Sequence, residues 1–159
     1  MVVQKLKEFL DGWGIKYVVI KHSMAYTAQE VAASAHIPGE QLAKTVMVKI
    51  DGKIAMAVLC ATDIVDINRL EDVVGAGRVE LAGEREFNSL FPGCDIGAMP
   101  PFGNLYNMAV FVDENLSRDK DIAFNAGSHA ELIRLAYSDY ERLVKPTVGR
   151  FGYKSTQCL

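Results

Sequence analysis

The sequence has few cysteines and no long apolar segment. Its three cysteines, Cys60, Cys94 and Cys158, show no C-x-x-C spacing, which argues against a disulfide framework and against a zinc site. The longest uninterrupted apolar run, residues 54–61, is far shorter than the roughly 20 residues that a membrane helix needs. The first residues carry charges and do not resemble a secretory signal. These absences favour a cytoplasmic protein with no membrane partner.

Common cofactor and catalytic motifs are also absent. No phosphate-binding G-x-x-x-x-G-K-[ST] or G-x-G-x-x-G sequence follows an expected strand. There is no G-x-S-x-G nucleophile elbow, and the three widely spaced histidines form no H-E-x-x-H motif. The sequence therefore predicts no cofactor and no metal ion.

The composition is that of one globular domain. The 159 residues are 50% hydrophobic and 23% charged, a balance that argues against bulk disorder. The 17 Lys and Arg residues against 20 Asp and Glu residues leave a formal charge of −3. This charge excludes a generally basic nucleic-acid coat, although a local basic face remains possible.

Hydrophobic periodicity and turn residues predict an α+β fold. Strands are expected at residues 15–20, 45–50, 53–60, 79–81, 108–112, 121–125 and 131–136, and helices at residues 2–12, 28–35, 67–74 and 84–90, with a further helix ending near 144 and a helical turn over 40–43. Because helices do not alternate regularly with strands, we expect a mixed or antiparallel central sheet, curled into a barrel and surrounded by helices.

Several local signals set the limits of these elements. Asp51-Gly52 between two apolar runs predicts a two-residue hairpin turn. Residues 27–30 and 138–141 have the sequence of capping boxes, and Asp66 is expected to cap the helix that follows it. Residues 93–107 show no periodicity and contain three glycines and two prolines, which indicates a turn system or a functional loop.

Three segments hold candidate functional residues. Lys44-Thr45 opens an apolar strand, so Lys44 is either a solvated edge charge or an ammonium that binds a phosphate or a carbonyl oxygen at a pocket mouth. Residues 97–103, Gly-Ala-Met-Pro-Pro-Phe-Gly, form either a rigid surface turn or a stiff backbone wall of a pocket. Residues 125–129, Asn-Ala-Gly-Ser-His, form either a hairpin turn or a loop that directs His129 toward a pocket.

Together with residues 22–32 and 42–46, these segments resemble the YbaK-type aminoacyl-tRNA deacylases, which share a domain with the editing insertion of bacterial prolyl-tRNA synthetase. The resemblance covers residues 1–145 as a single domain, and residues 146–159 form a basic tail outside it. It implies an α+β fold with a central mixed β-barrel. It also implies metal-independent hydrolysis of the ester between an amino acid and the 3′ end of tRNA, in which a water or the terminal ribose hydroxyl acts in place of a protein nucleophile and the protein mainly positions the ester.

The resemblance further implies roles for individual residues. Lys44 would anchor the 3′ end of the substrate, and His129 would act beside it as the second catalytic candidate. The substrate is expected to contact His22, Tyr26, Thr45, Gly97, Pro101, Phe102, Gly103, Asn125, Gly127 and Ser128. Alanyl-specific members have asparagine where Thr45 stands, and the cysteinyl-specific branch has a Ser-Pro pair in the loop at 99–101, so this chain matches neither branch.

Three functions fit these residues. The first is a free-standing trans-editing hydrolase that deacylates mischarged tRNA, with proline tRNA carrying a small non-cognate amino acid as the expected substrate. The second is a non-catalytic module of the same fold that binds tRNA or a protein. The third is hydrolysis of an unrelated small ester or amide. The expected partner is the 3′ acceptor end of aminoacyl-tRNA, with an aminoacyl-tRNA synthetase as a further candidate. The basic stretch 142–154 is either an RNA contact or a solvated terminus.

Overall fold

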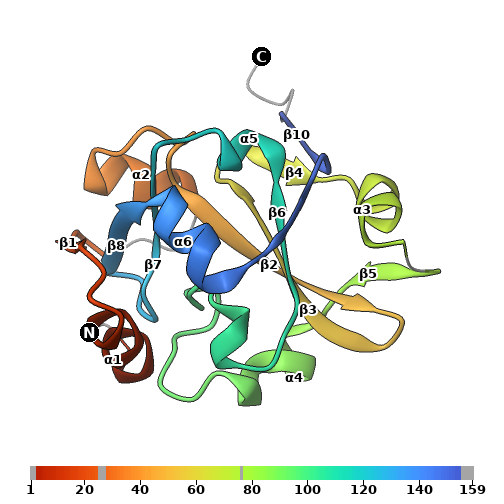
Figure 1. Cartoon of the computed structure of the whole chain (residues 1–159), viewed down its shortest axis with the longest axis horizontal. Helices are drawn as coiled ribbons and strands as arrows, with labels where there is room; N and C mark the ends of the chain where they lie inside the picture. Colours follow the sequence, from red (N-terminus) through yellow and green to blue (C-terminus); the bar gives the residue numbers. More distant parts are fainter. Residues whose placement is uncertain (1–2, 25–27, 76, 155–159) are drawn as a thin grey trace.

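Three sheets and six α-helices make up the computed structural model, which describes residues 3–24, 28–75 and 77–154 (Figure 1). The helices are α1 (Gln4–Gly12), α2 (Ala28–Ala35), α3 (Ile67–Val74), α4 (Glu84–Phe87), α5 (Glu114–Ser117) and α6 (Tyr137–Val144). Single 3₁₀ turns follow at Asn88–Leu90 and Gly103–Leu105. No helix of the described residues is long and apolar enough to cross a membrane.

The strands form sheets of five, three and two. In spatial order the largest contains β5 (Val79–Leu81), β2 (Ala43–Ile50), β3 (Lys53–Cys60), β6 (Val110–Asp113) and β9 (Thr147–Gly149). The second contains β1 (Tyr17–Lys21), β8 (Glu131–Ala136) and β7 (Asp121–Asn125), and the third pairs β10 (Gly152–Lys154) with β4 (Asp63–Val65). Figure 1 shows the three-stranded sheet at one end of the molecule and the tip of the β2–β3 hairpin toward the other.

The largest sheet is mixed, as predicted. β2 is antiparallel to β3 and β5, whereas β6 runs parallel to both β3 and β9. The expected barrel is not confirmed, because the strand pairings of the described residues form three sheets and no closed one. The five- and three-stranded sheets are joined by a single parallel bridge between Leu42 and Ala123. This bridge places the residue before β2 beside the middle of β7.

The β2–β3 hairpin follows the local sequence signal. Asp51 and Gly52 both have positive φ angles, of 49° and 87°, as a type I′ turn requires. The turn fixes the register, so that Lys44 pairs with Leu59 and Thr45 with Val58. Helix α3 is also confirmed: the Asp66 side chain accepts a 3.2 Å hydrogen bond from the Arg69 N–H, and Gly75 caps the other end of the helix.

Two predicted helix starts are wrong. Residues 40–42 form a turn and a bridge rather than a helical turn, because this segment carries the link between the two sheets. Helix α6 begins at Tyr137, with Ala136 as the N-cap and no side-chain cap hydrogen bond, so residues 138–141 are not a capping box. The predicted cap at Thr27 lies outside the described residues.

The main core lies between helix α1, helix α6 and the two larger sheets. Leu6 and Leu10 of α1 are fully buried, as the amphipathic pattern predicts. At the centre, the rings of Phe102, Phe124 and Tyr140 pack against one another with centroid separations of 5.3–6.5 Å. Aromatic rings of this size bury much apolar surface. Here they connect Phe102 to strand β7 and to helix α6.

The basic C-terminal segment is part of the fold as far as residue 154. Phe151 is fully buried between strands β9 and β10. Asp113 at the end of β6 accepts hydrogen bonds from the N–H groups of Phe151 and Gly152, at 2.9 and 2.7 Å. Most of residues 147–154 are exposed, but strand pairing and these hydrogen bonds hold them, so they are not a frayed terminus.

Candidate active site

One small cavity brings together the three segments singled out in the sequence. Its volume is about 140 Å³, and its lining comes from the start of β2, the loop before the Gly103–Leu105 turn and the end of β7: Leu42, Ala43, Lys44, Thr45, Gly97, Met99 and Asn125. These segments are distant in sequence. The bridge between the two sheets and a network of loop hydrogen bonds bring them together.

Lys44 supplies the positive charge of this cavity. Its side chain is half-buried, and burial lowers the pKa of its ammonium. The negative charge of Asp63 opposes this lowering, and Asp63 is itself 2% exposed. The cavity thus contains a cation that has lost part of its hydration, which strengthens its attraction for an anionic or developing negative group.

Cys60 lies one strand away, opposite Ala43 in the β2–β3 register. Burial, followed by the negative charge of Asp63, raises the pKa of its thiol to about 12. The thiolate is the nucleophilic form of cysteine. Cys60 is therefore a neutral core residue near pH 7.

The loop at residues 97–103 has a rigid backbone. Gly97 has a φ of +86°, a conformation that glycine adopts without the cost that a side chain would add. Its N–H contacts the Met99 sulfur at 3.2 Å. Further along, the carbonyl of Pro101 accepts a 2.7 Å hydrogen bond from the hydroxyl of buried Tyr140. The loop is therefore held from inside the core.

Backbone hydrogen bonds join this loop to the 125–129 loop. The Asp95 N–H donates to the Gly127 carbonyl at 2.8 Å, and the Gly127 N–H donates to the Ala98 carbonyl at 2.9 Å. The N–H of His129 lies 3.3 Å from an Asp95 carboxylate oxygen. Each loop donates hydrogen bonds to the other, so their relative position is fixed. Together the two loops form one edge of the cavity.

His129 is 8% exposed and does not line the cavity. Its Nε2 lies 2.7 Å from the Ile96 carbonyl oxygen. A carbonyl oxygen only accepts hydrogen bonds, so Nε2 carries the hydrogen. The ring also lies against the backbone of Gly97, where an added Cβ would be 3.5 Å from the His129 Cε1. His129 thus connects the loop directly to the 125–129 segment.

Several predicted substrate contacts lie behind the loop instead of on the cavity lining. Phe102 is fully buried in the aromatic core, and Pro101 is buried with its carbonyl turned to Tyr140. Gly103 packs so closely on the next strand that a Cβ would lie 2.5 Å from the Met108 carbonyl oxygen. These residues fix the position of the loop from the core side.

The remaining predicted contacts lie at the edge of the site. A Cβ at Gly127 would lie 3.0 Å from that of Val3, so this glycine permits close packing of the chain before α1. The Ser128 hydroxyl accepts from the Ala130 N–H at 3.3 Å, an ordinary turn interaction. His22 bonds through its N–H to the Ala130 carbonyl. None of the three lines the cavity, and Tyr26 lies outside the described residues.

Asn125 does line the cavity, and its side-chain oxygen is buried with no hydrogen-bond partner in the described part of the chain. A buried acceptor without a partner costs free energy, which a bound N–H group would recover. Sequence reasoning missed the contributions of Leu42, Met99 and Tyr140. Their apolar or aromatic character signals only burial, and their place at the site depends on long-range packing.

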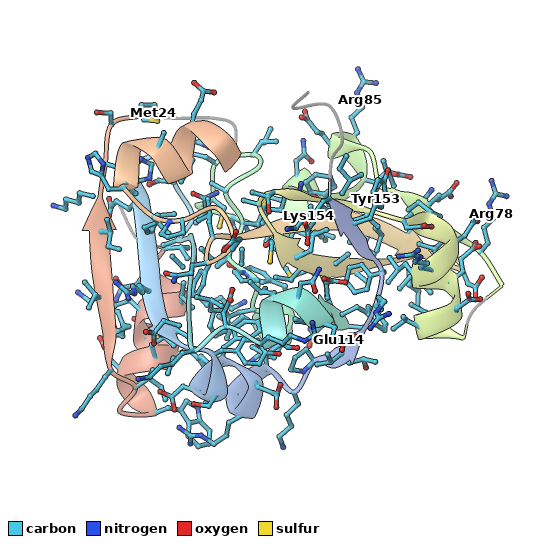
Figure 2. All side chains as sticks on the ribbon, turned by 90° about the horizontal axis from the view of Figure 1, so that it is seen from above. Met24, Arg78, Arg85, Glu114, Tyr153 and Lys154 are labelled. Atoms are coloured by element: carbon cyan, nitrogen blue, oxygen red, sulfur yellow. The ribbon has the colours of Figure 1, made fainter. Side chains whose placement is uncertain are left out.

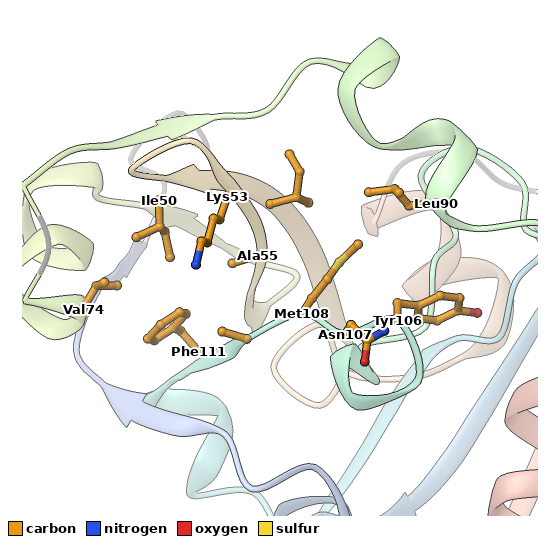
Figure 3. A pocket seen from close by; sticks show the side chains of 11 residues that line it. Ile50, Lys53, Ala55, Val74, Leu90, Tyr106, Asn107, Met108 and Phe111 are labelled. Atoms are coloured by element: carbon orange, nitrogen blue, oxygen red, sulfur yellow. The ribbon is translucent and has the colours of Figure 1, made fainter.

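A larger hollow of about 490 Å³ lies near the β2–β3 hairpin and shares no lining residue with the Lys44 cavity (Figure 3). Its lining is mainly aliphatic and aromatic, with Lys53 as its charged member. It contains none of the predicted site residues. Among the described residues, no group of three or more His, Cys, Asp or Glu side chains could hold a metal ion.

Comparison with known proteins agrees with this arrangement. The family described as "Aminoacyl-tRNA editing domain" matches residues 22–143, which include every lining residue of the Lys44 cavity. The chain belongs to the aminoacyl-tRNA editing domain family. Members of this family act on aminoacyl-tRNA, and the predicted resemblance is confirmed.

Individual relatives include complete proteins and parts of larger ones. The chain is 29% identical over 153 residues to the multifunctional Ser/Thr-tRNA deacylase ProXp-y of Escherichia coli (strain K12), covering 93% of this chain and 91% of the relative. It is 32% identical over 85 residues to the proline–tRNA ligase of Bacillus cytotoxicus. The aligned residues are 54% of this chain but 15% of the ligase.

Solved structures show the same fold. The crystal structure of hypothetical protein APE2540 aligns with a TM-score of 0.84 at 20% identity, covering 94% of this chain and all of that one. A candidate trans-editing enzyme for prolyl tRNA synthetase aligns with a TM-score of 0.78 at 21% identity, covering 94% and 96% of the two chains. At these identities the likeness establishes the fold alone.

Proposed function

We propose that this protein is a free-standing editing hydrolase that deacylates tRNA, with proline tRNA carrying a small non-cognate amino acid as the substrate class. The observation that carries the proposal is the half-buried Lys44 ammonium in a 140 Å³ cavity, beside the unpartnered amide oxygen of Asn125. The match to a deacylase, over 93% of this chain and 91% of the relative, supports this proposal.

The reaction needs little more than positioning and charge. A water attacks the ester carbonyl carbon, with the neighbouring ribose hydroxyl as its hydrogen-bonding partner, and the carbonyl oxygen gains negative charge as the tetrahedral centre forms; the proton lost by the water ends on the departing ribose oxygen. The C–O bond to the ribose then breaks, releasing the amino acid and leaving a free hydroxyl on the tRNA. In this scheme the Lys44 ammonium stabilises either the developing oxyanion or a phosphate of the 3′ end.

The cavity limits which amino acid enters. It is smaller than the roughly 300–1,000 Å³ typical of sites for drug-sized ligands. We assign the Asn125 oxygen to the N–H groups of the substrate's α-ammonium. We expect amino acids with short side chains, such as serine, alanine and threonine, to enter, and the name of the Escherichia coli relative includes two of these three amino acids. A second sieve of this kind acts on amino acids that a synthetase pocket cannot strongly exclude.

A deacylation panel tests the proposal. Proline tRNA charged with alanine, cysteine, serine, threonine or proline, and alanine tRNA charged with serine or glycine, would be incubated with wild type and with Lys44→Ala. We expect release of a small non-cognate amino acid, with kcat/KM lower by about 10²–10³-fold in the variant. Binding of tRNA without release of any amino acid would contradict an enzyme and indicate a non-catalytic module. Equal release from a small aminoacyl ester would indicate a general esterase.

The kinetic pattern of Lys44→Ala separates the two roles of the ammonium. If Lys44 stabilises the oxyanion, kcat falls while KM changes little, because the interaction exists only in the transition state. If Lys44 binds a phosphate equally in both states, KM rises at constant kcat.

His129 is proposed as a positioning residue. Its Nε2–H holds the Ile96 carbonyl, and a glutamine side chain can donate the same hydrogen bond. We expect His129→Gln to retain most of kcat and His129→Ala to lose it. If His129 transfers a proton, both variants lose about 10²–10⁴-fold and the pH profile changes.

A further inference from the structure

A second surface lies at the far end of helix α1 from the cavity. It centres on Trp13, the single tryptophan of the chain, which is 61% exposed. Trp13 borders a hollow of about 430 Å³ whose other lining residues are Phe9, Asn104, Arg142, Leu143 and Lys145. The proposed reaction uses none of these residues.

The aromatic part of this surface is anchored in the core. Phe9 packs against Trp13 with a centroid separation of 6.4 Å, and against buried Phe102 at 6.2 Å. The indole therefore rests on a fixed aromatic neighbour while most of its own surface faces solvent. An exposed, supported aromatic ring offers a face on which a nucleobase can stack, at about 1–3 kcal/mol per base.

The rest of the surface is positively charged. Arg142 lies in the last turn of α6 and Lys145 follows that helix, and no described lining residue of the hollow is acidic. Arg142 contacts Asp139 at 3.1 Å, but its side chain remains 59% exposed. Lys145 forms no ion pair with any described residue, and it holds a left-handed conformation with φ of 53°. The charge of this surface is suited to an anion.

Helix α1 sets the distance between this surface and the active site. Before α1 begins, the Val3 N–H donates a 2.9 Å hydrogen bond to the Ala126 carbonyl in the loop beside the cavity. Trp13 follows the other end of the same helix. With a rise of 1.5 Å per residue, the ten steps from Val3 to Trp13 span about 15 Å. A ligand bound in the cavity and extending along α1 reaches Trp13 after a few nucleotides.

We propose that this surface binds the RNA of the substrate next to its aminoacylated end, with a base stacked on Trp13 and phosphates at Arg142 and Lys145. The proposal rests on the proposed function, because it takes aminoacyl-tRNA as the ligand. A protein with a formal charge of −3 attracts RNA weakly from a distance, so a local cationic surface is needed for phosphate contacts. The combination of a stacking ring and adjacent cations favours RNA over a protein partner.

Binding measurements test the surface directly. The intrinsic emission of Trp13 should change when uncharged proline tRNA is titrated into wild-type protein. With labelled tRNA, we expect Trp13→Ala to weaken binding about tenfold and Trp13→Phe to restore part of the loss. The double variant Arg142→Gln/Lys145→Gln should lower the magnitude of the slope of log K against log salt by about 1.4. Each of the two lost contacts with a single-strand phosphate contributes about 0.7 to that slope.

The chain offers a charge-matched control. Arg69 contacts Asp66 three residues earlier at 3.6 Å, with 52% of its side chain exposed, much as Arg142 contacts Asp139. Arg78 is 79% exposed and lies at the end of the molecule away from α1 (Figure 2). Arg69→Gln/Arg78→Gln should therefore change binding and salt slope little. Equal losses in both double variants would overturn the proposal, because the effect would then be one of net charge.

Activity on two substrates separates this surface from the catalytic site. We expect the Trp13 and Arg142/Lys145 variants to lower kcat/KM on full-length charged tRNA by about tenfold and to leave hydrolysis of a 3′-aminoacyl adenosine unchanged. Lys44→Ala should impair both. If wild type hydrolyses both substrates and the surface variants match it in binding and rate, this surface is not an RNA site. Thermal unfolding of each variant shows whether it remains folded.

Discussion

The hydroxyl of Tyr140 offers a sharp test of how the active-site loop is held. Tyr140 is fully buried, and its hydroxyl donates a 2.7 Å hydrogen bond to the Pro101 carbonyl. Tyr140→Phe removes one oxygen atom and keeps the ring, which packs edge-on against Phe102 at 5.3 Å and 88°. The substitution therefore isolates the hydrogen bond from the packing.

The expected cost comes from a buried acceptor left without its donor. Such a loss costs about 1–3 kcal/mol, because the Pro101 carbonyl has no water in its place. In a domain of this size each kcal/mol corresponds to about 2–4 °C in Tm, so Tyr140→Phe should lower Tm by about 2–12 °C. The released loop should also lower kcat/KM, since Gly97 and Met99 of the same loop line the cavity.

Urea and thermal unfolding of Tyr140→Phe and of Tyr17→Phe provide the comparison. The Tyr17 hydroxyl donates to Asp11 at 2.8 Å, but at the surface, where water replaces the lost partner. We expect Tyr17→Phe to change the free energy of unfolding by less than about 0.5 kcal/mol. Equal effects of the two substitutions would refute the inferred burial of the Pro101 carbonyl. An unchanged kcat/KM in Tyr140→Phe would refute its link to the loop.

Three further substitutions test the site and its surroundings. Lys44→Met should lower deacylation as much as Lys44→Ala does yet raise Tm at neutral pH, because burial lowers the pKa of this lysine; calorimetry should show the gain fading as pH rises toward 10.5, where both states lose the charge. Gly97→Ala should cost about 1–2 kcal/mol at φ +86° and reduce activity, whereas Gly12→Ala, at the last residue of α1 and without a positive φ, should change the free energy of unfolding by less than about 1 kcal/mol in urea. Asp113→Ala should cost about 2–6 kcal/mol by the same assay, because two buried N–H groups lose their acceptor.

Elements fixed by neighbouring residues were predictable. The Asp51-Gly52 turn, the Asp66 cap and the amphipathic face of α1 each depend on groups a few residues apart, and each is confirmed. The C-terminal strands β9 and β10 were not predicted. Each is three residues long and is formed by pairing with β6 or β4, more than thirty residues earlier in the chain. No local pattern indicates such a partner.

The start of α6 shows how packing overrides a local signal. Residues 138–141 have the sequence of a capping box, but the helix begins one residue before them. Tyr137 and Tyr140 are both buried, and a helix that starts at Tyr137 turns both rings toward the core. The burial of two aromatic side chains outweighs a cap worth about 1 kcal/mol.

The sequence by itself determined the local elements, the absence of known cofactor motifs and the residues that resemble an editing domain. Lys44, Thr45, Gly97 and Asn125 were among those residues, and the structure brings them together at one cavity. Only the tertiary structure decided which of the candidates face the cavity and which, like Phe102 and His129, hold its walls. Which side chains face the cavity, and which are buried behind it, depends on contacts between segments far apart in the chain. The same contacts remove water from Lys44, and this desolvation gives the ammonium its lowered pKa.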